Sequence, residues 1–459
     1  MTILALKIEN KSSFPDDQVN IGFVPGTGAP CDISYQSPST IEPLSIDVLP
    51  LNIGASYPFA GNWYKLSDLP DSLAISAFSG RIYVAYQTPW SVEGKQYEPG
   101  QAVTDPNFFL RYDKMEMTFT GNPADVANLT SIDYWSIPMS LKTSKNGAPA
   151  GTVQGLLNNA KTQDVYDALL SLTTPPVSGL PGVAGNDGTP IPALVPGQFV
   201  QYDPSSPAPG NDFARIIGPS SYPSINPQGI PVLPYDTFEG YLSYLNEQFG
   251  TNTTTGAVIP GLGNGVIAKI AGKFAGVGSD APSNGPLSKQ TYDLTAKIDA
   301  QSNITLSGTV GNGAKHVTMA FAKNDLINPS GIYGANAPFS LDGAAAAPPV
   351  NNVYGWISGD LLAGINIGAI GSSVSVGKDS PKMVGSMPSH DWFNLPNSLL
   401  FGGLQTSKTY NQWAAKLAPL SQAYNFAYSD RFAPVFASLN PAKANELTLI
   451  LEPGNVVMS

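Results

Sequence analysis

Two carboxylic acids, Glu116 and Asp133, lie in a stretch whose pattern predicts two β-strands joined by a short polar loop. In the first predicted strand apolar and polar residues alternate, which places Glu116 on the face opposite the core. The second predicted strand contains Asp133 and ends at Pro138. If the hairpin is centred between Ala124 and Asp125, Glu116 faces Asp133 directly, with β-carbons roughly 4.5–5.5 Å apart.

Two carboxyl groups at this separation are unfavourable for structure alone but useful for acid–base chemistry. One carboxyl donates a proton while the other removes one from water, and a neighbouring anion raises the pKa of one of them. The alternative is a solvated, hydrogen-bonded pair at the rim of a sheet. The spacing by itself favours that alternative.

The composition limits the class of ligand. The chain has 459 residues, of which 12% are charged, and its formal net charge is −11. This balance argues against nucleic acid or an anionic membrane as a partner and favours a neutral, hydroxyl-rich ligand. No apolar run approaches the ~20 residues of a transmembrane helix. The low fraction of charged residues and the many Gly and Pro residues are typical of a loop-rich β protein that works outside cells.

Cysteine and histidine are scarce. Cys31 is the single cysteine, and His316 and His390 are the two histidines. An internal disulfide and a cysteine- or histidine-rich metal site are therefore excluded, and we expect neither metal nor cofactor. The first ten residues alternate like a strand and do not form a signal peptide, so a secreted protein would have lost its signal or use another route.

The predicted elements that position the two acids are mostly short strands. Strands separated by turn residues fill residues 1–140 and return after Tyr292, which predicts a sandwich or barrel. Two helices are expected between them, over Asn158–Leu172 and Tyr235–Phe249. Residues 265–278 could form a cationic amphipathic helix, but we expect a short helix or loop packed on the body.

Several motifs, taken in chain order, resemble those of glycoside hydrolase family 64, the laminaripentaose-producing β-1,3-glucanases of the thaumatin-like superfamily. The stretch from Tyr112 to Phe119 resembles the family's D-x-x-E-F-T strand, and that from Asn128 to Pro138 resembles N-x-T-x-V-D-x-F-G-L-P. Further matches are Ser79–Val84, Phe213–Pro219, Asn328–Ala335 and Tyr424–Asp430. The resemblance therefore extends over most of the chain.

The resemblance implies a mainly β fold: a thaumatin-like β-barrel or sandwich with an inserted mixed α/β domain and a wide groove between the two. The barrel is expected at residues 1–145, completed by 395–459. The inserted domain is expected at residues 146–394.

The resemblance also implies roles for single residues. Glu116 matches the general acid and Asp133 the general base of an inverting hydrolase. The implied substrate-binding residues are Thr118, Thr120, Asn128, Thr130, Trp135, Tyr428 and Asp430. Thr120 stands where the family has Asn, and Trp135-Ser136 where it has Phe-Gly. Alternation places Trp135 on the face of Asp133, which makes it the best candidate among the tryptophans for stacking on a sugar.

These inferences predict a monomeric β-1,3-glucan hydrolase that cleaves laminarin- or curdlan-type glucans to short oligosaccharides. Inversion requires carboxyls roughly 6.5–9.5 Å apart and retention about 5–5.5 Å, and direct cross-strand pairing is compatible with either. The alternative function is a non-catalytic glucan-binding or structural protein on the same scaffold. Binding of glucan without turnover would distinguish it from the enzyme.

Overall fold

The structure of the protein is a computed structural model that describes residues 2–26, 28–35, 63–87, 111–170, 172, 215–221, 237–251, 257–274, 290–334, 336–346, 353–405, 409–432 and 435–454. The chain divides into two compact units. The first comprises residues 1–234, 416–425 and 434–459, and the second comprises residues 235–415 and 426–433.

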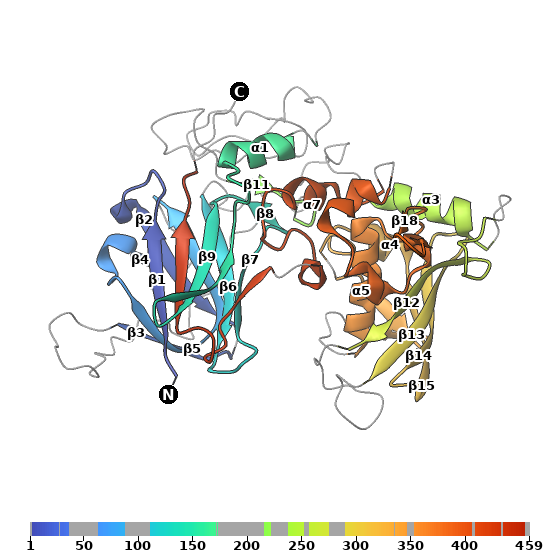
Figure 1. Cartoon of the computed structure of the whole chain (residues 1–459), viewed down its shortest axis with the longest axis horizontal. Helices are drawn as coiled ribbons and strands as arrows, with labels where there is room; N and C mark the ends of the chain where they lie inside the picture. Colours follow the sequence, from blue (N-terminus) through green and yellow to red (C-terminus); the bar gives the residue numbers. More distant parts are fainter. Residues whose placement is uncertain are drawn as a thin grey trace. The chain divides into compact units, whose positions relative to one another are not determined.

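The first unit is built on one large sheet (Figure 1). Its order is β10-β9-β21-β1-β5-β6-β7-β20, and β2, β3 and β4 are attached beside β5. The strands are β1 (Leu4–Asn10), β2 (Val19–Pro25), β3 (Cys31–Tyr35), β4 (Trp63–Lys65), β5 (Leu73–Tyr86), β6 (Tyr112–Phe119), β7 (Val126–Leu129), β9 (Met139–Lys145), β10 (Ala148–Val153), β20 (Phe436–Ser438) and β21 (Glu446–Leu451). Strand β20 lies close to β9 and β10, so the sheet is a nearly closed barrel.

Alternation along the strands fills the barrel interior. In β6, Met115, Met117 and Phe119 are buried in the core, whereas Glu116 and Thr118 are partly exposed. This confirms the period of two predicted for the segment. Strand β21 lies parallel to β1 and antiparallel to β9, so a late segment of the chain joins the first strand to the β9–β10 hairpin.

The units end at residues other than the predicted boundaries, 145 and 395. Strand β10 was expected in the inserted domain, but it forms a hairpin with β9 and remains in the barrel sheet. Helix α1 (Thr162–Leu170) also belongs to the first unit, and Thr162 Oγ1 donates a hydrogen bond to the Pro453 carbonyl. The short segments 395–415 and 426–433 belong to the second unit.

The second unit is a mixed α/β body. Its sheet has the order β12-β13-β14-β15-β16-β17, with every neighbouring pair antiparallel. These strands are β12 (Val266–Lys273), β13 (Thr291–Ile298), β14 (Ile304–Val310), β15 (Lys315–Phe321), β16 (Phe339–Leu341) and β17 (Ala344–Ala346). Helix α5 (Val353–Ile367) is buried on nearly every side and packs beside the sheet (Figure 1).

The remaining elements are short. They are the helices α3 (Glu239–Phe249), α4 (Lys323–Ile327), α6 (Ser389–Trp392) and α7 (Gln412–Leu417) and the strands β8 (Tyr134–Trp135), β11 (Ile216–Ile217), β18 (Ser375–Val376) and β19 (Lys382–Met383). The helix predicted over Tyr235–Phe249 is confirmed from Glu239 onward. The expectation for 265–278 was wrong, because residues 266–273 are the strand β12, paired along its length with β13.

Candidate active site

Glu116 and Asp133 both lie in the first unit, but they are not cross-strand partners. Strand β6 pairs with β7, and the register places Glu116 opposite Asn128. Asp133 follows in the turn before β8. The predicted register was wrong because the side chain of Asp125 closes the turn early: it accepts hydrogen bonds from the backbone N–H groups of Thr120 at 2.7 Å and Asn122 at 2.8 Å.

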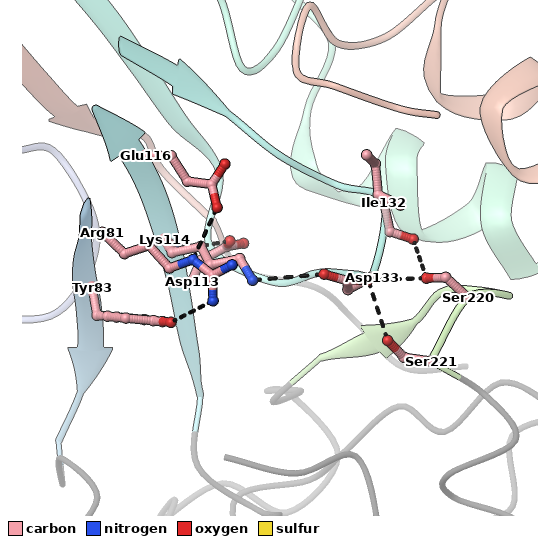
Figure 2. Close-up of polar contacts among 9 residues, drawn as sticks. All are labelled: Arg81, Tyr83, Asp113, Lys114, Glu116, Ile132, Asp133, Ser220 and Ser221. Carbon is pink, nitrogen blue, oxygen red and sulfur yellow. Dashed lines mark hydrogen bonds and ion pairs between the residues drawn. The ribbon is translucent and has the colours of Figure 1, made fainter. Parts of the chain in front are cut away.

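Arg81 holds Glu116 on the outer face of the barrel. Arg81 lies opposite Glu116 on β5, and its Nε donates to Glu116 Oε1 at 2.9 Å. The Nη1 atom of Arg81 lies 3.4 Å from the hydroxyl of Tyr83, which is on the same face of β5. Figure 2 shows the ion pair between Arg81 and Glu116. The side chain of Glu116 is 38% exposed and that of Arg81 is 42% exposed, so the ion pair is open to a ligand.

Asp133 is held by a buried cation and two hydroxyl groups. Lys114 lies two positions before Glu116 on β6, and its Nζ is 3.7 Å from Asp133 Oδ2. On the other side, Ser220 Oγ donates to Asp133 Oδ1 at 3.0 Å and Ser221 Oγ lies at 3.4 Å. The Lys114 side chain is only 3% exposed, whereas that of Asp133 is 44% exposed. Figure 2 shows the Lys114 side chain reaching towards Asp133.

Each carboxylate therefore has a cation beside it instead of the other carboxylate. The predicted arrangement, in which one anion adjoins the other, is not found. Because opposite charges attract, each acid is oriented by its own cation, and the two carboxylates are not placed against each other.

A third acid, Asp113, fixes the backbone that carries Asp133. Its carboxylate accepts hydrogen bonds from the backbone N–H groups of Lys114 at 2.8 Å, Ser136 at 3.1 Å and Ile137 at 3.0 Å. Asp113 is buried, and burial raises the pKa of its carboxyl to about 7, although the three N–H donors and Lys114 oppose that shift. One feature of the sequence indicates this structural role: Asp113 is an acid on the core-facing side of a predicted strand.

The segment 215–221 supports the same turn from outside. Strand β11 pairs with β8, and the Gly218 N–H donates to the Asp133 carbonyl at 2.7 Å. A β-carbon on Gly218 would lie 2.5 Å from the Ile132 carbonyl oxygen, so only glycine fits this close approach. The buried guanidinium of Arg215 lies 4.3 Å from the ring of Tyr112 and 5.8 Å from that of Tyr134.

Three predicted binding residues lie on the face of Glu116. Asn128 is its direct neighbour on β7, and Thr118 follows two positions later on β6, where its hydroxyl lies 2.9 Å from Ser79 Oγ. Thr130 continues the alternation of β7 beyond Asn128 and forms a bridge with Tyr424. All three are partly exposed, so their hydroxyl and amide groups are available to a polar ligand.

Thr120 and Trp135 have other surroundings. Thr120 is exposed and belongs to the turn, where its hydroxyl donates to Asp125 Oδ1 at 3.2 Å. Trp135 is 3% exposed, so the prediction that its ring faces a sugar was wrong. The physical reason is its strand partner: Trp135 pairs with Ile216, and its ring lines a small pocket of about 20 Å³, large enough for about one water molecule.

Tyr428 and Asp430 belong to the second unit, and their place in one site with Glu116 stays a prediction. Their local structure is fixed from within that unit. Tyr428 has a left-handed backbone (φ 67°), and Arg431 nearby pairs with the fully buried Asp360. A β-carbon on Gly359 would lie 2.8 Å from the Tyr428 ring, so this packing also requires glycine.

Within the described ranges, no three His, Cys, Asp or Glu side chains gather closely enough to hold a metal ion. No helix that the structure describes is long and apolar enough to cross a membrane.

Comparison with known proteins matches part of the chain to a family. The family profile of glycoside hydrolase 64, described as beta-1,3-glucanase, matches residues 65–222, a range that contains Glu116, Asp133 and the supporting segment around Gly218. Residues 65–222, about a third of the chain, therefore match glycoside hydrolase family 64. The family 64 motifs from Tyr112 to Pro138 thus lie in the matched range. No curated protein matches the sequence.

Two solved structures share the fold of this chain over nearly its whole length. A laminaripentaose-producing β-1,3-glucanase in complex with laminaritetraose is 18% identical, with 99% of each chain covered and a TM-score of 0.54. A β-1,3-glucanase domain (GH64) from Clostridium beijerinckii is 13% identical, with 98% of each chain covered and a TM-score of 0.53. The mainly β architecture and the family prediction are confirmed, whereas the thaumatin-like label and the groove between the units stay predictions.

Proposed function

We propose that this family 64 glycoside hydrolase cleaves β-1,3-glucan with Glu116 as general acid and Asp133 as general base. The observation that carries the proposal is the pair of half-exposed carboxylates, each held by its own cation on the outside of the barrel. Glycoside hydrolysis requires one group that protonates the leaving oxygen and one that activates water. The family description and the bound laminaritetraose of the solved neighbour support β-1,3-glucan as the substrate.

The surroundings of Asp133 suit the base. A buried ammonium and two hydroxyl donors stabilise a carboxylate in one orientation, and the exposed part of the side chain is left to accept a proton from water. Since Asp113 and Gly218 fix the backbone on both sides, the carboxylate is preorganised for this step.

The surroundings of Glu116 suit the acid. Its partner Arg81 is a long, partly exposed side chain, and a surface ion pair of this kind contributes little to stability. A glucan bound on this face can therefore displace the guanidinium and present its glycosidic oxygen to a protonated Glu116. Asn128 and Thr118 beside it offer hydrogen bonds to sugar hydroxyls.

The arrangement favours inversion. Residues two apart on a strand are roughly 7 Å apart, and Asp133 is held at the ammonium end of Lys114 and not against Glu116. We infer that the water molecule that attacks the sugar binds between the two ion pairs. Inverting enzymes require this gap, with carboxyls roughly 6.5–9.5 Å apart.

The test is the release of oligosaccharides from laminarin and curdlan by the wild type, Glu116→Gln and Asp133→Asn. We expect release by the wild type and a loss of at least about a thousandfold in kcat in each variant, with unchanged circular dichroism. Proton NMR of the first product should show the α anomer. Glucan binding without turnover by the wild type would refute the enzyme, and a β anomer would refute inversion.

We also propose that the protein acts outside the cell as a monomer. A glucan polymer is too large to enter a cell, and the low fraction of charged residues agrees with a place outside the cell. Cell fractionation and a mass measurement in solution test the two points separately.

A further inference from the structure

Phe436 is the one aromatic residue among the large hydrophobic side chains that are exposed in the described part of the chain. Its side chain is 38% exposed, and it lies in the edge strand β20 of the first unit. The next residue, Ala437, points into the core, so the alternation of the strand directs Phe436 outward. A single exposed apolar residue is ordinary on a protein surface, so the position of Phe436 relative to the proposed acid decides whether it has a role.

The register places Phe436 in line with the proposed acid. Phe436 lies opposite Asn128, Asn128 lies opposite Glu116, and Glu116 lies opposite Arg81. Directly opposed residues of antiparallel strands project from the same face. The four side chains therefore form a row across β20, β7, β6 and β5, with the ring at one end and the ion pair at the other.

We propose that Phe436 is a sugar-stacking residue that binds a glucosyl unit next to the cleavage point and so sets the preference for longer glucans. The inference rests on the glucan hydrolysis proposed above and adds the position and the residue of a binding subsite. The ring offers an apolar surface, and the neighbouring Asn128 offers an amide that donates and accepts hydrogen bonds.

This combination fits the chemistry of a β-linked glucosyl unit. The ring hydrogens of such a sugar form an apolar face, whereas its hydroxyls project around the rim. An aromatic ring covers the apolar face while an adjacent amide satisfies the hydroxyls, as in ligand sites that combine apolar surface with few polar groups. An anionic ligand gains nothing from the face of the Phe436 ring, which agrees with the neutral substrate inferred from the composition.

The distance between Phe436 and Glu116 also suits a bound oligosaccharide. Neighbouring strands are about 4.8 Å apart, so β20 lies roughly 10 Å from β6, which carries Glu116. A short oligosaccharide covers this span. A sugar against Phe436 is therefore bound beside the one whose linkage Glu116 protonates, and short substrates that do not reach the ring lose this contact.

The test uses kinetics and binding with laminarin-derived oligosaccharides of increasing length. We expect Phe436→Ala to lower kcat/KM for the longest oligosaccharides about tenfold, mainly through KM, and to have little effect on the shortest that are cleaved. Phe436→Tyr should retain activity because it keeps the ring, whereas Phe436→Leu should behave like the alanine variant because a branched chain offers no flat surface.

The matched control is Ile3→Ala, which removes an apolar side chain of similar exposure from the same unit and should leave kinetics unchanged. Binding is measured by calorimetry with laminaripentaose in the Glu116→Gln background, so that binding is tested without turnover. If Phe436→Ala binds and cleaves long substrates like the wild type, or if Phe436→Leu matches Phe436→Tyr, the inference is overturned. Failure of the wild type to cleave glucan refutes the proposed function instead.

Discussion

Replacing Asp113 by Asn should change how the stability of the first unit depends on pH. Burial penalises the charged form and raises the folded-state pKa of Asp113 to about 7, well above the ordinary value of an aspartate carboxyl. A raised carboxyl pKa means that the folded state holds its proton more tightly than the unfolded state. Stability from this group is therefore fully present below about pH 4 and is lost progressively as the pH rises through 7.

The magnitude follows from the two pKa values. Between about pH 5 and about pH 8 the unfolded carboxyl is almost fully ionised, whereas the folded one loses its proton only near 7. At 1.36 kcal/mol for each pKa unit, the group lowers the free energy of unfolding by about 2–3 kcal/mol over this range. Asn cannot titrate, so its variant lacks this contribution.

The amide of Asn also lowers the free energy of unfolding in a way that does not depend on titration. The two carboxylate oxygens of Asp113 accept three backbone N–H groups, and the amide nitrogen of Asn would face at least one of them. An unsatisfied buried donor costs about 1–3 kcal/mol. The variant should therefore be clearly less stable than the wild type near pH 5 and should approach it near pH 8.

The assay is urea unfolding of both proteins across this range, read by hydrogen exchange of the β6 amides so that the first unit is observed. Because both proteins contain the same other titrating groups, the contributions of those groups cancel in the difference between the two free energies of unfolding. A difference that stays constant from about pH 5 to about pH 8, or grows with pH, would refute the reasoning.

Two further pairs of substitutions test the support of Asp133. Ser220→Ala removes the hydroxyl that lies 3.0 Å from Asp133 Oδ1 and should lower kcat on laminarin about fivefold. Ser221→Ala removes the hydroxyl at 3.4 Å and should have a smaller effect. Equal effects of the two variants would contradict the geometry. Gly218→Ala places a β-carbon against the Ile132 carbonyl and should lower both the melting temperature and kcat, whereas Gly147→Ala, at a turn with open space but positive φ, should lower only the melting temperature. An active, normally stable Gly218→Ala variant would show that the segment is not needed for the turn.

The sequence predicted the faces of the strands well, because alternation depends only on neighbouring residues. The exposed position of Glu116 and the burial of Met115 and Met117 follow from it directly. The pairing register does not follow from alternation, because it depends on where the chain turns. Here the side chain of Asp125 decided the turn, and Asn128 took the place predicted for Asp133.

Contacts between distant segments could not be predicted for a related reason. Trp135 was expected on an open face because β11, some eighty residues later, is not recognisable as its strand partner. Lys114 lies on the face of Glu116 by simple alternation, but its ion pair with Asp133 depends on the turn. Phe436 gave no signal at all, since its relation to the site exists only through the order of the strands.

The strand order has a consequence for how this protein is made. Strand β21 joins β1 to β9, and β20 completes the edge next to β7, yet both follow the whole second unit along the chain. During synthesis the hairpin β9–β10 and the four strands β1–β5–β6–β7 have unpaired edges until residues 435–454 have been made. Such long-range pairing is slow, and unpaired edges favour aggregation. The second unit is therefore expected to fold first, while the barrel that carries both acids is still incomplete.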